Sequence, residues 1–378
     1  MPEPFKNNFN TPIIRAMATH LARAMPEFDQ HASVAFATDG LDQLELKQRA
    51  DRITDSLERH LPQDFPAAAQ VMIDSLAPAH VHANMVVQDG PNDQGIKGWA
   101  VMPMAEYIAR RGQGHVELSL DTLKIMTSRF SSEFAVRPFL VNHQQQTIEV
   151  FSAWAKDENE HVRRLVSEGT RPRLPWGLRL HAFVTDPSPV IALLERLKDD
   201  PSEYVRRSVA NNLNDIAKDH PDRVADIAKS WMINANRDRQ RLVRHSLRTL
   251  IKAGNSGALQ ALGYGPPEIE VKGFSLKSSQ IMLGETLSFE IEIASTSKAP
   301  QPLVIDYAVH HLRANGKTTP KVFKWKTVRL DGDASLIAAK RHAIKPITTR
   351  RYYPGLHHVE VLINAKSVAR ADFELLIP

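Results

Sequence analysis

The sequence predicts a mainly α-helical protein that ends in an all-β domain: an α-solenoid of HEAT-like helix pairs followed by an immunoglobulin-like β-sandwich. A repeated helix–turn–helix pattern in the middle of the chain predicts the first part. The second part follows from the spacing of apolar residues, which changes to every second position near residue 266. The 378 residues suffice for two domains, and 42% apolar residues suffice for packed cores.

Residues 1–265 carry the pattern of amphipathic helices. The segment 44–59, for example, places apolar residues three or four positions apart among strong helix formers. Gly263, Gly265 and the pair Pro266-Pro267 then interrupt this pattern. We therefore expect a HEAT-like repeat domain over 1–265, which carries the chemistry, and a β-sandwich over 266–378.

Three segments of the helical part share one pattern, in which Asp lies five residues before a Val-Arg pair. The repeats begin 43 and then 38 residues apart, close to the roughly 40–47 residues of a HEAT unit. Each copy follows an amphipathic helix, so each marks the turn between two paired helices. A fourth, degraded copy covers 131–137, and an irregular helical bundle is the alternative. The complete copies are Asp157 to Arg163, Asp200 to Arg206 and Asp238 to Arg244.

The repeated Asp and the first Arg of each copy have a structural explanation. They either cap helices, because a carboxylate satisfies free amide groups at a helix N-terminus, or they form a ladder of ion pairs between repeats. The second basic residue of each copy is freer to face a ligand. These residues are Arg164, Arg207 and His245.

Short strands separated by turns fill the last third of the chain. About 110 residues with this pattern are typical of an immunoglobulin-like sandwich. The segment 267–378 holds 10 Lys and 6 Arg against 11 Asp and Glu, so it carries the whole net charge of +5. This excess favours an anionic partner such as nucleic acid. The predicted strands include 287–293, 359–363 and 372–377, with turns at Gly284-Glu285, Asn315-Gly316, Asp331-Gly332 and Pro354-Gly355.

Several classes of site are excluded. The chain has no Cys, which excludes disulfides, Cys-bound zinc, iron–sulfur clusters and cysteine nucleophiles. It contains no HExxH, GxxxxGKS/T or GxGxxG motif. The pairs His310-His311 and His357-His358 lack metal-ligand spacing, and we expect them at the surface because neighbours in a strand point to opposite faces. We therefore predict no metal and no cofactor.

The sequence also indicates where the protein acts. No apolar run approaches the ~20 residues needed to span a bilayer, and the N-terminus has no apolar targeting segment. We expect a cytoplasmic monomer without membrane contact.

Two carboxylates are the first candidates for chemistry. Glu168 lies six residues beyond the Val of its repeat and Asp215 lies ten beyond, a difference of about one helical turn. Stacked repeats then direct both carboxylates toward one place. Asn211, Asn212 and Asn214 add polar groups where packing alone favours Ala or Leu. Alternatively, the two carboxylates cap helix ends or pair with Arg207 and Arg171.

A loop at 170–177 follows the first repeat. It contains Arg171, Arg173, two Pro and Trp176. A stiff, cationic loop with a stacking surface suits a phosphate backbone or an exposed base. The alternative is a loop that buries Trp176 against the solenoid.

Three segments, 45–49, 162–177 and 206–216, resemble the AlkC/AlkD DNA alkylation-repair glycosylases, and the sandwich resembles the AlkC branch with an immunoglobulin-like domain. The resemblance implies a monofunctional glycosylase that removes cationic N-alkylated bases, such as 3-methyladenine and 3-methylcytosine, from duplex DNA. It also implies that DNA bends against the concave surface of the repeats, without a deep base-flipping pocket.

The resemblance also assigns site residues. Glu168 and Asp215 match acidic positions beside the lesion, and Glu133 matches a third position that the repeat pattern does not reveal. Trp176 matches the loop aromatic. The paired Trp residues of the AlkD branch have no clear counterparts in this chain.

We expect Glu133, Glu168 and Asp215 to stabilise the oxocarbenium-like sugar that forms as a cationic base departs, or to activate water. The expected partner is double-stranded DNA with alkylated bases, which places the protein at the nucleoid. The alternative is a HEAT-repeat scaffold that binds nucleic acid or protein without chemistry. Expected DNA contacts, besides Trp176, are Arg164, Arg171, Arg173, Arg207, Arg248, Lys252, Arg350 and Arg351.

Overall fold

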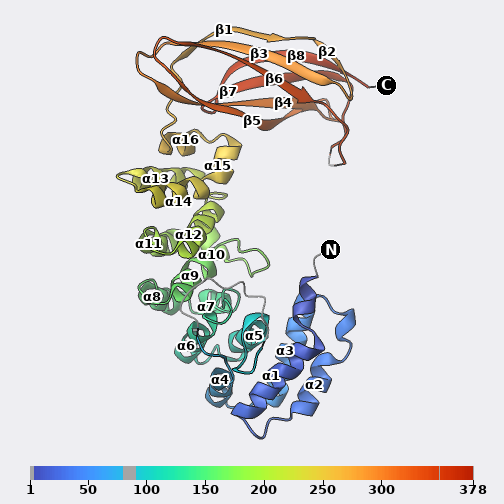
Figure 1. Cartoon of the computed structure of the whole chain (residues 1–378), viewed down its shortest axis with the longest axis vertical. Coiled ribbons are helices and arrows are strands. Elements are labelled where there is room, and N and C mark those ends of the chain that lie inside the picture. The colour runs from blue at the N-terminus through green and yellow to red at the C-terminus, as the bar shows by residue number, and fades with distance from the viewer. Residues whose placement is uncertain (1–3, 80–90, 349, 378) are drawn as a thin grey trace. The chain divides into compact units, whose positions relative to one another are not determined.

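The computed structural model describes residues 4–79, 91–348 and 350–377 (Figure 1). Its internal contacts divide the chain into two compact units, Met1–Asp219 and His220–Pro378. The second unit therefore contains the last helices as well as the strands. Each unit is described separately below.

Within its described residues, the first unit is built from helices joined by loops. Its α-helices are α1 (Thr11–Ala24), α2 (Gln30–Thr38), α3 (Leu46–His60), α4 (Phe65–Asp74), α5 (Val101–Arg111), α6 (Val116–Thr127), α7 (Arg137–Asn142), α8 (Gln144–Trp154), α9 (Glu160–Gly169), α10 (His181–Thr185), α11 (Ser188–Leu197) and α12 (Glu203–Ile216). Short 3-10 helices are η1 (Phe5–Asn8), η2 (Leu41–Gln43) and η3 (Gly98–Ala100). The degraded repeat copy at 131–137 is a turn that leads into α7.

The predicted helix pairs are present as α8 with α9 and α11 with α12. The second helices of these pairs, α9 and α12, pack against each other. The repeated Val explains this stacking, because Val162 is 3% exposed and Val205 is fully buried. Asn159 caps α9 by accepting a hydrogen bond from the His161 amide at 2.8 Å.

The repeated Asp and Arg form a ladder between repeats. Arg163 of α9 donates to both carboxylate oxygens of Asp200 in the next repeat, at 2.6 and 2.9 Å. Lys124 of α6 makes the equivalent contact with Asp157 at 2.7 Å. The carboxylates of Asp157 and Asp200 also accept from the amides of Asn159 and Ser202, which fixes the turns. For Asp157 and Asp200 both structural explanations therefore apply, because each carboxylate joins the ladder and also satisfies an amide at the start of a helix.

The second unit begins with four helices: α13 (Pro221–Met232), α14 (Arg237–Ser246), α15 (Arg248–Ala253) and α16 (Ser256–Ala261). Helix α13 packs against α14 and α16, and Val243 of the third repeat is fully buried. This repeat differs from the others in one respect. Asp238 lies inside the first turn of α14, whereas Asp157 and Asp200 precede their helices.

The rest of the second unit is the predicted sandwich (Figure 1). One sheet has the order β1-β3-β6 and the other the order β2-β8-β7-β4-β5. Leu287, Phe289, Ile291 and Ile293 of β3 are at most 3% exposed, as period two requires. The strands are β1 (Ile269–Leu276), β2 (Gln280–Met282), β3 (Thr286–Ser295), β4 (Gln301–Leu312), β5 (Thr318–Leu330), β6 (Ser335–Ala343), β7 (Gly355–Ile363) and β8 (Lys366–Leu376).

The expectation that the His pairs lie at the surface is wrong. Strand β4 pairs with β5 on one side and β7 on the other, so it is a central strand. His311, His357 and His358 are 4%, 0% and 8% exposed, and His310 Nε2 donates to Glu360 Oε2 at 2.7 Å. The two His residues of each pair do point to opposite faces of the sheet, as neighbours in a strand must. In this sandwich, however, side chains cover both faces of the sheet at these positions.

Candidate functional site

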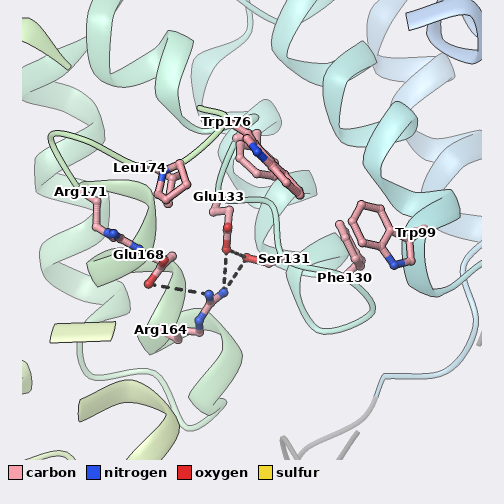
Figure 2. A pocket seen from close by; sticks show the side chains of 11 residues that line it. Trp99, Phe130, Ser131, Glu133, Arg164, Glu168, Arg171, Leu174 and Trp176 are labelled. Carbon is pink, nitrogen blue, oxygen red and sulfur yellow. Dashed lines mark hydrogen bonds and ion pairs between the residues drawn. The ribbon is translucent and has the colours of Figure 1, made fainter. Parts of the chain in front are cut away.

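A pocket of about 330 Å³ in the first unit combines carboxylates with aromatic walls (Figure 2). Glu133 and Glu168 lie on either side of the Arg164 guanidinium, while Trp99 and Phe130 lie beyond Ser131. The remaining lining residues are Phe134, Arg171, Leu174, Pro175 and Trp176. Within the described part of the chain, no group of His, Asp or Glu is arranged to hold a metal ion.

Segments distant in sequence meet at this pocket. Glu168 stands in the last turn of α9, and Glu133 belongs to the turn before α7. Trp99 comes from η3, whereas Trp176 comes from the loop after α9. The first ~115 residues therefore contribute a wall of the site and do more than extend the solenoid.

Arg164 connects the two pocket carboxylates. Its Nη1 donates to Glu133 Oε2 at 2.8 Å and to Ser131 Oγ at 3.0 Å, and its Nη2 lies 3.7 Å from Glu168 Oε2. The guanidinium also lies over the Tyr204 ring, 4.8 Å from its centroid. Burial by itself would lower the pKa of Arg164, but Glu133, Tyr204 and Glu168 together outweigh burial and raise that pKa.

Glu168 is only 5% exposed, yet it is held in its charged form. Arg171 Nη1 donates to its Oε1 at 2.6 Å and Ser208 Oγ donates to its Oε2 at 2.6 Å. Burial alone would raise the pKa of Glu168. Arg164, Arg171 and the Ser208 hydroxyl together outweigh burial and hold that pKa below its usual value.

Asp215 meets Glu168 through a shared partner. Arg171 Nε donates to Asp215 Oδ2 at 2.8 Å, and Lys218 Nζ lies 2.9 Å from Asp215 Oδ1. The two carboxylates therefore converge on Arg171, as the one-turn offset predicts. Asp215 is 2% exposed and does not line the pocket. Its pairing with Arg171 is the alternative considered above, whereas Arg207 pairs with Glu203 at 3.0 Å.

The Asn residues near Asp215 serve packing in at least one case. Asn212 is fully buried and donates to the Ser167 carbonyl at 2.7 Å and to Thr170 Oγ1 at 3.0 Å. These bonds join α12 to the end of α9, which carries Glu168.

The predicted phosphate-binding residues fall into two groups. Arg164, Arg171 and Arg173 are engaged by carboxylates; Arg173 donates to both oxygens of Asp219 at 2.8 and 2.6 Å. Arg164 and Arg171 line the pocket, whereas Arg173 does not. Phosphate binding by these three residues stays a prediction, and it would require them to contact DNA alongside their carboxylate partners. The exposed cations are Arg207 in the first unit and Arg248, Lys252 and Arg351 in the second, with Arg350 half-buried.

Trp176 forms an exposed aromatic wall. Its side chain is 63% exposed, so the alternative that the loop buries it is wrong. Its φ is 64°, a left-handed conformation that is rare for an aromatic residue. The Phe5 ring lies edge-on to Trp176 at 6.3 Å between ring centroids and tilted against Trp99 at 6.0 Å. The rings of Trp99 and Phe130 are 5.1 Å apart.

Sequence reasoning missed Trp99 and Phe130. Both contribute through long-range packing, and neither belongs to a repeat copy. The one local signal is Gly98, whose φ of 67° turns the chain immediately before Trp99.

The pocket places carboxylates beside aromatic rings. The charges of its lining residues balance, because Glu133 and Glu168 stand beside Arg164 and Arg171, while Asp215 lies outside the lining and pairs with Arg171 and Lys218. The electron-rich aromatic faces attract a positively charged ring. Buried carboxylates also stabilise positive charge that develops during a reaction.

Comparisons with known proteins identify the family. A family model described as a DNA alkylation repair enzyme matches residues 127–250. A second, described as the C-terminal Ig-like domain of the uncharacterised protein YhaZ, matches residues 270–377. YhaZ of Bacillus subtilis (strain 168) is 34% identical over 372 residues, which cover 98% of this chain and 99% of that protein.

A solved structure resembles the whole chain. It is the Pseudomonas fluorescens alkylpurine DNA glycosylase AlkC bound to DNA containing an abasic site analog, with 36% identity and a TM-score of 0.76. The match covers 99% of this chain and 100% of that chain. In the described residues, no helix has the length and apolar character required to cross a membrane. The chain belongs to the AlkC-type family of DNA alkylation repair proteins with a C-terminal immunoglobulin-like domain.

Proposed function

We propose that the protein is a monofunctional DNA glycosylase that excises cationic N-alkylated bases, such as 3-methyladenine and 3-methylcytosine, from duplex DNA. The observation that carries this proposal is the pocket in which two carboxylates, Glu133 and Glu168, stand beside aromatic walls. The repair family and the similarity to a DNA-bound glycosylase support it.

The chemistry follows from the charge of the lesion. An alkylated, positively charged base departs as a neutral molecule, so it needs no general acid. Positive charge then develops on the deoxyribose. At ~4 Å and an effective dielectric of ~20, one carboxylate stabilises that charge by roughly 4 kcal/mol, or about three decades in rate.

The three carboxylates have different roles in this proposal. Glu168, held ionised by its neighbours, stabilises the sugar cation. Glu133, which accepts from Ser131 Oγ at 2.7 Å, orients the attacking water. Asp215 does not reach the pocket, so it acts through Arg171 as a positioning residue.

DNA binding uses a separate set of cations. Arg207, Arg248, Lys252, Arg350 and Arg351 bind backbone phosphates, and Trp176 stacks near the lesion. The protein acts as a monomer on nucleoid DNA. Residues 1–265 carry the catalysis and residues 266–378 add DNA contacts.

The test is an excision assay without added metal or nucleotide. The full-length protein is incubated with methylated duplex DNA, and released free bases are separated and quantified. The proposal predicts release of 3-methyladenine and 3-methylcytosine and formation of abasic sites. Binding without release would favour the alternative, a scaffold that holds nucleic acid without chemistry.

A further inference from the structure

Arg137 is a fully buried arginine at the base of the Trp176 loop. It opens α7, and its Nε donates to the Leu178 carbonyl at 2.6 Å while its Nη1 donates to the Gly169 carbonyl at 2.8 Å. Its buried Nη2 has no hydrogen-bond partner among the described residues. Buried polar groups usually have a hydrogen-bond partner. A buried guanidinium that leaves one nitrogen without a partner therefore raises the question of what its two other hydrogen bonds do.

The two carbonyls lie on either side of the loop. Gly169 ends α9, one residue after Glu168, and Leu178 follows Trp176 by two residues. A single planar side chain therefore joins the start of the loop to its end. Lysine has one nitrogen on a flexible stem and does not reproduce this fork.

The loop is strained where it carries the indole. Trp176 has a positive φ, and Gly177 packs directly on the arginine: a Cβ at Gly177 would lie 3.2 Å from Arg137 Nε and 3.1 Å from Leu174 Cδ2. Strained backbone of this kind persists only where the surrounding structure fixes it.

Arg137 makes no direct ion pair among the described residues, and both of its bonds go to backbone carbonyls. Burial, with a smaller effect of the Arg171 charge, lowers its pKa to about 10. Neutralising a carboxylate, the task of Arg164 and Arg171, is therefore not its main role.

We propose that Arg137 is a positioning residue that clamps the two ends of the loop and so holds Trp176 outward as a wall of the pocket. The expected effect of Arg137 on the excision rate rests on the proposed function. The clamp itself concerns only the geometry of the loop and the position of Trp176.

The kinetic test compares Arg137→Lys with Arg206→Lys under single-turnover conditions at saturating enzyme. Arg206 is a matched control, because it also donates to two backbone carbonyls, of Asp200 and Pro201, at 2.6 and 2.8 Å. A displaced wall predicts about a tenfold or larger fall in excision rate for Arg137→Lys, since small misplacements are costly in catalysis. Equal rates in the two variants would overturn the proposal.

A double-mutant cycle tests whether the effect passes through Trp176. In a Trp176→Ala background, Arg137→Lys should change the excision rate by less than about twofold. The same rate loss with and without the indole would show that Arg137 acts by another route. A merely structural role predicts that second result.

Gly177→Ala provides a variant that keeps the arginine, in case Arg137→Lys does not fold. The added methyl group presses on the guanidinium from the loop side and should also lower the excision rate. An unchanged rate in Gly177→Ala would contradict the clamp.

Acrylamide quenching of Trp176 fluorescence separates this proposal from the proposed function. The signal is the difference between each protein and its Trp176→Phe counterpart, without DNA. Arg137→Lys should change the quenching constant of Trp176, and Arg206→Lys should leave it unchanged. If the wild-type protein releases no base, the proposed function fails, while unchanged quenching in Arg137→Lys would reject the clamp by itself.

Discussion

The pocket of the first unit and the sandwich of the second unit use basic residues in opposite ways. In the pocket, Arg164 and Arg171 are turned toward carboxylates and shielded from water. On the sandwich, Arg350 and Arg351 lie over Tyr352 and Tyr353, at 5.8 and 5.5 Å, and neither forms an ion pair with a described residue. Arginine in the first unit therefore organises negative charge, whereas arginine on the sandwich is available to an anion.

Buried titratable groups differ in the same way. Glu168 is buried and charged, because guanidinium and hydroxyl partners surround it. His311 is buried and neutral: burial, then the charge of Arg350, lowers its pKa to about 3. The pocket of the first unit therefore retains a buried charge, whereas His311 of the second unit stays neutral in the sandwich.

Neutralising Glu168 should have the largest effect. Glu168→Gln keeps the shape of the side chain and removes one negative charge, so excision should slow by about three decades. Single-turnover release of 3-methyladenine from duplex DNA measures this effect. Glu149→Gln, the same change on an exposed residue of α8, is the control. Equal rates in both variants would reject catalysis by Glu168.

Removing the shared arginine should destabilise the first unit strongly. Arg171→Met leaves Glu168 and Asp215 buried without their common partner, which should cost about 3–5 kcal/mol in the free energy of unfolding. Denaturant unfolding measures it. Arg207→Met removes an exposed pair with Glu203 and should change the unfolding free energy by at most about 1 kcal/mol. Similar losses in the two variants would contradict the difference in burial.

Two histidines, the buried His311 and the half-buried His342, should make the second unit sensitive to acid. The pKa of His311 is about 3 and that of His342 about 4, in both cases lowered first by burial and then by Arg350. The unfolded chain takes up protons below pH ~6.5 that the folded chain does not, so stability falls as pH falls toward these values. For His311 the slope reaches about 1.4 kcal/mol per pH unit.

Denaturant unfolding of the full-length protein between pH 7 and pH 5 measures this slope. His311→Phe removes one titrating group, and stability should then depend less on pH. If the unfolding free energy of His311→Phe depends on pH as steeply as that of the wild-type protein, His311 is not the source of the acid sensitivity.

Neutralising the sandwich cations should have a smaller effect. Arg350→Gln and Arg351→Gln should each weaken DNA binding regardless of sequence and lower the slope of log affinity against log salt by about 0.9 per lost phosphate contact. Binding titrations at several salt concentrations measure the slope. Lys298→Gln, an exposed loop residue of the same unit, is the control. Slopes that match wild type would remove these two arginines from the DNA interface.

The spacing of residues along the sequence predicted those features that depend on spacing along a helix. The repeated Val, the ladder of Asp and Arg, and the convergence of Glu168 and Asp215 all depend on residues at fixed helical offsets. Glu133 came from family resemblance alone, because no helix repeats it.

Long-range packing determined the rest. Trp99 reaches the pocket because η3 packs near the loop of Trp176, which no pattern encodes. The His pairs were misplaced because alternation does not reveal that β4 and β7 are central strands. The carboxylate partners of Arg164, Arg171 and Arg173 were not predicted, because a sequence does not show which cations are paired within the fold.

The central claim is that the ionised carboxylate of Glu168 stabilises a positively charged sugar. The most direct measurement compares the Kd of wild-type protein for two duplexes, one with a neutral tetrahydrofuran abasic site and one with a cationic pyrrolidine in its place. The account predicts that the cationic duplex binds about 10²-fold more tightly, as a transition-state mimic should, and that Glu168→Gln loses most of this preference. Equal affinities of the wild-type protein for the two duplexes would contradict it.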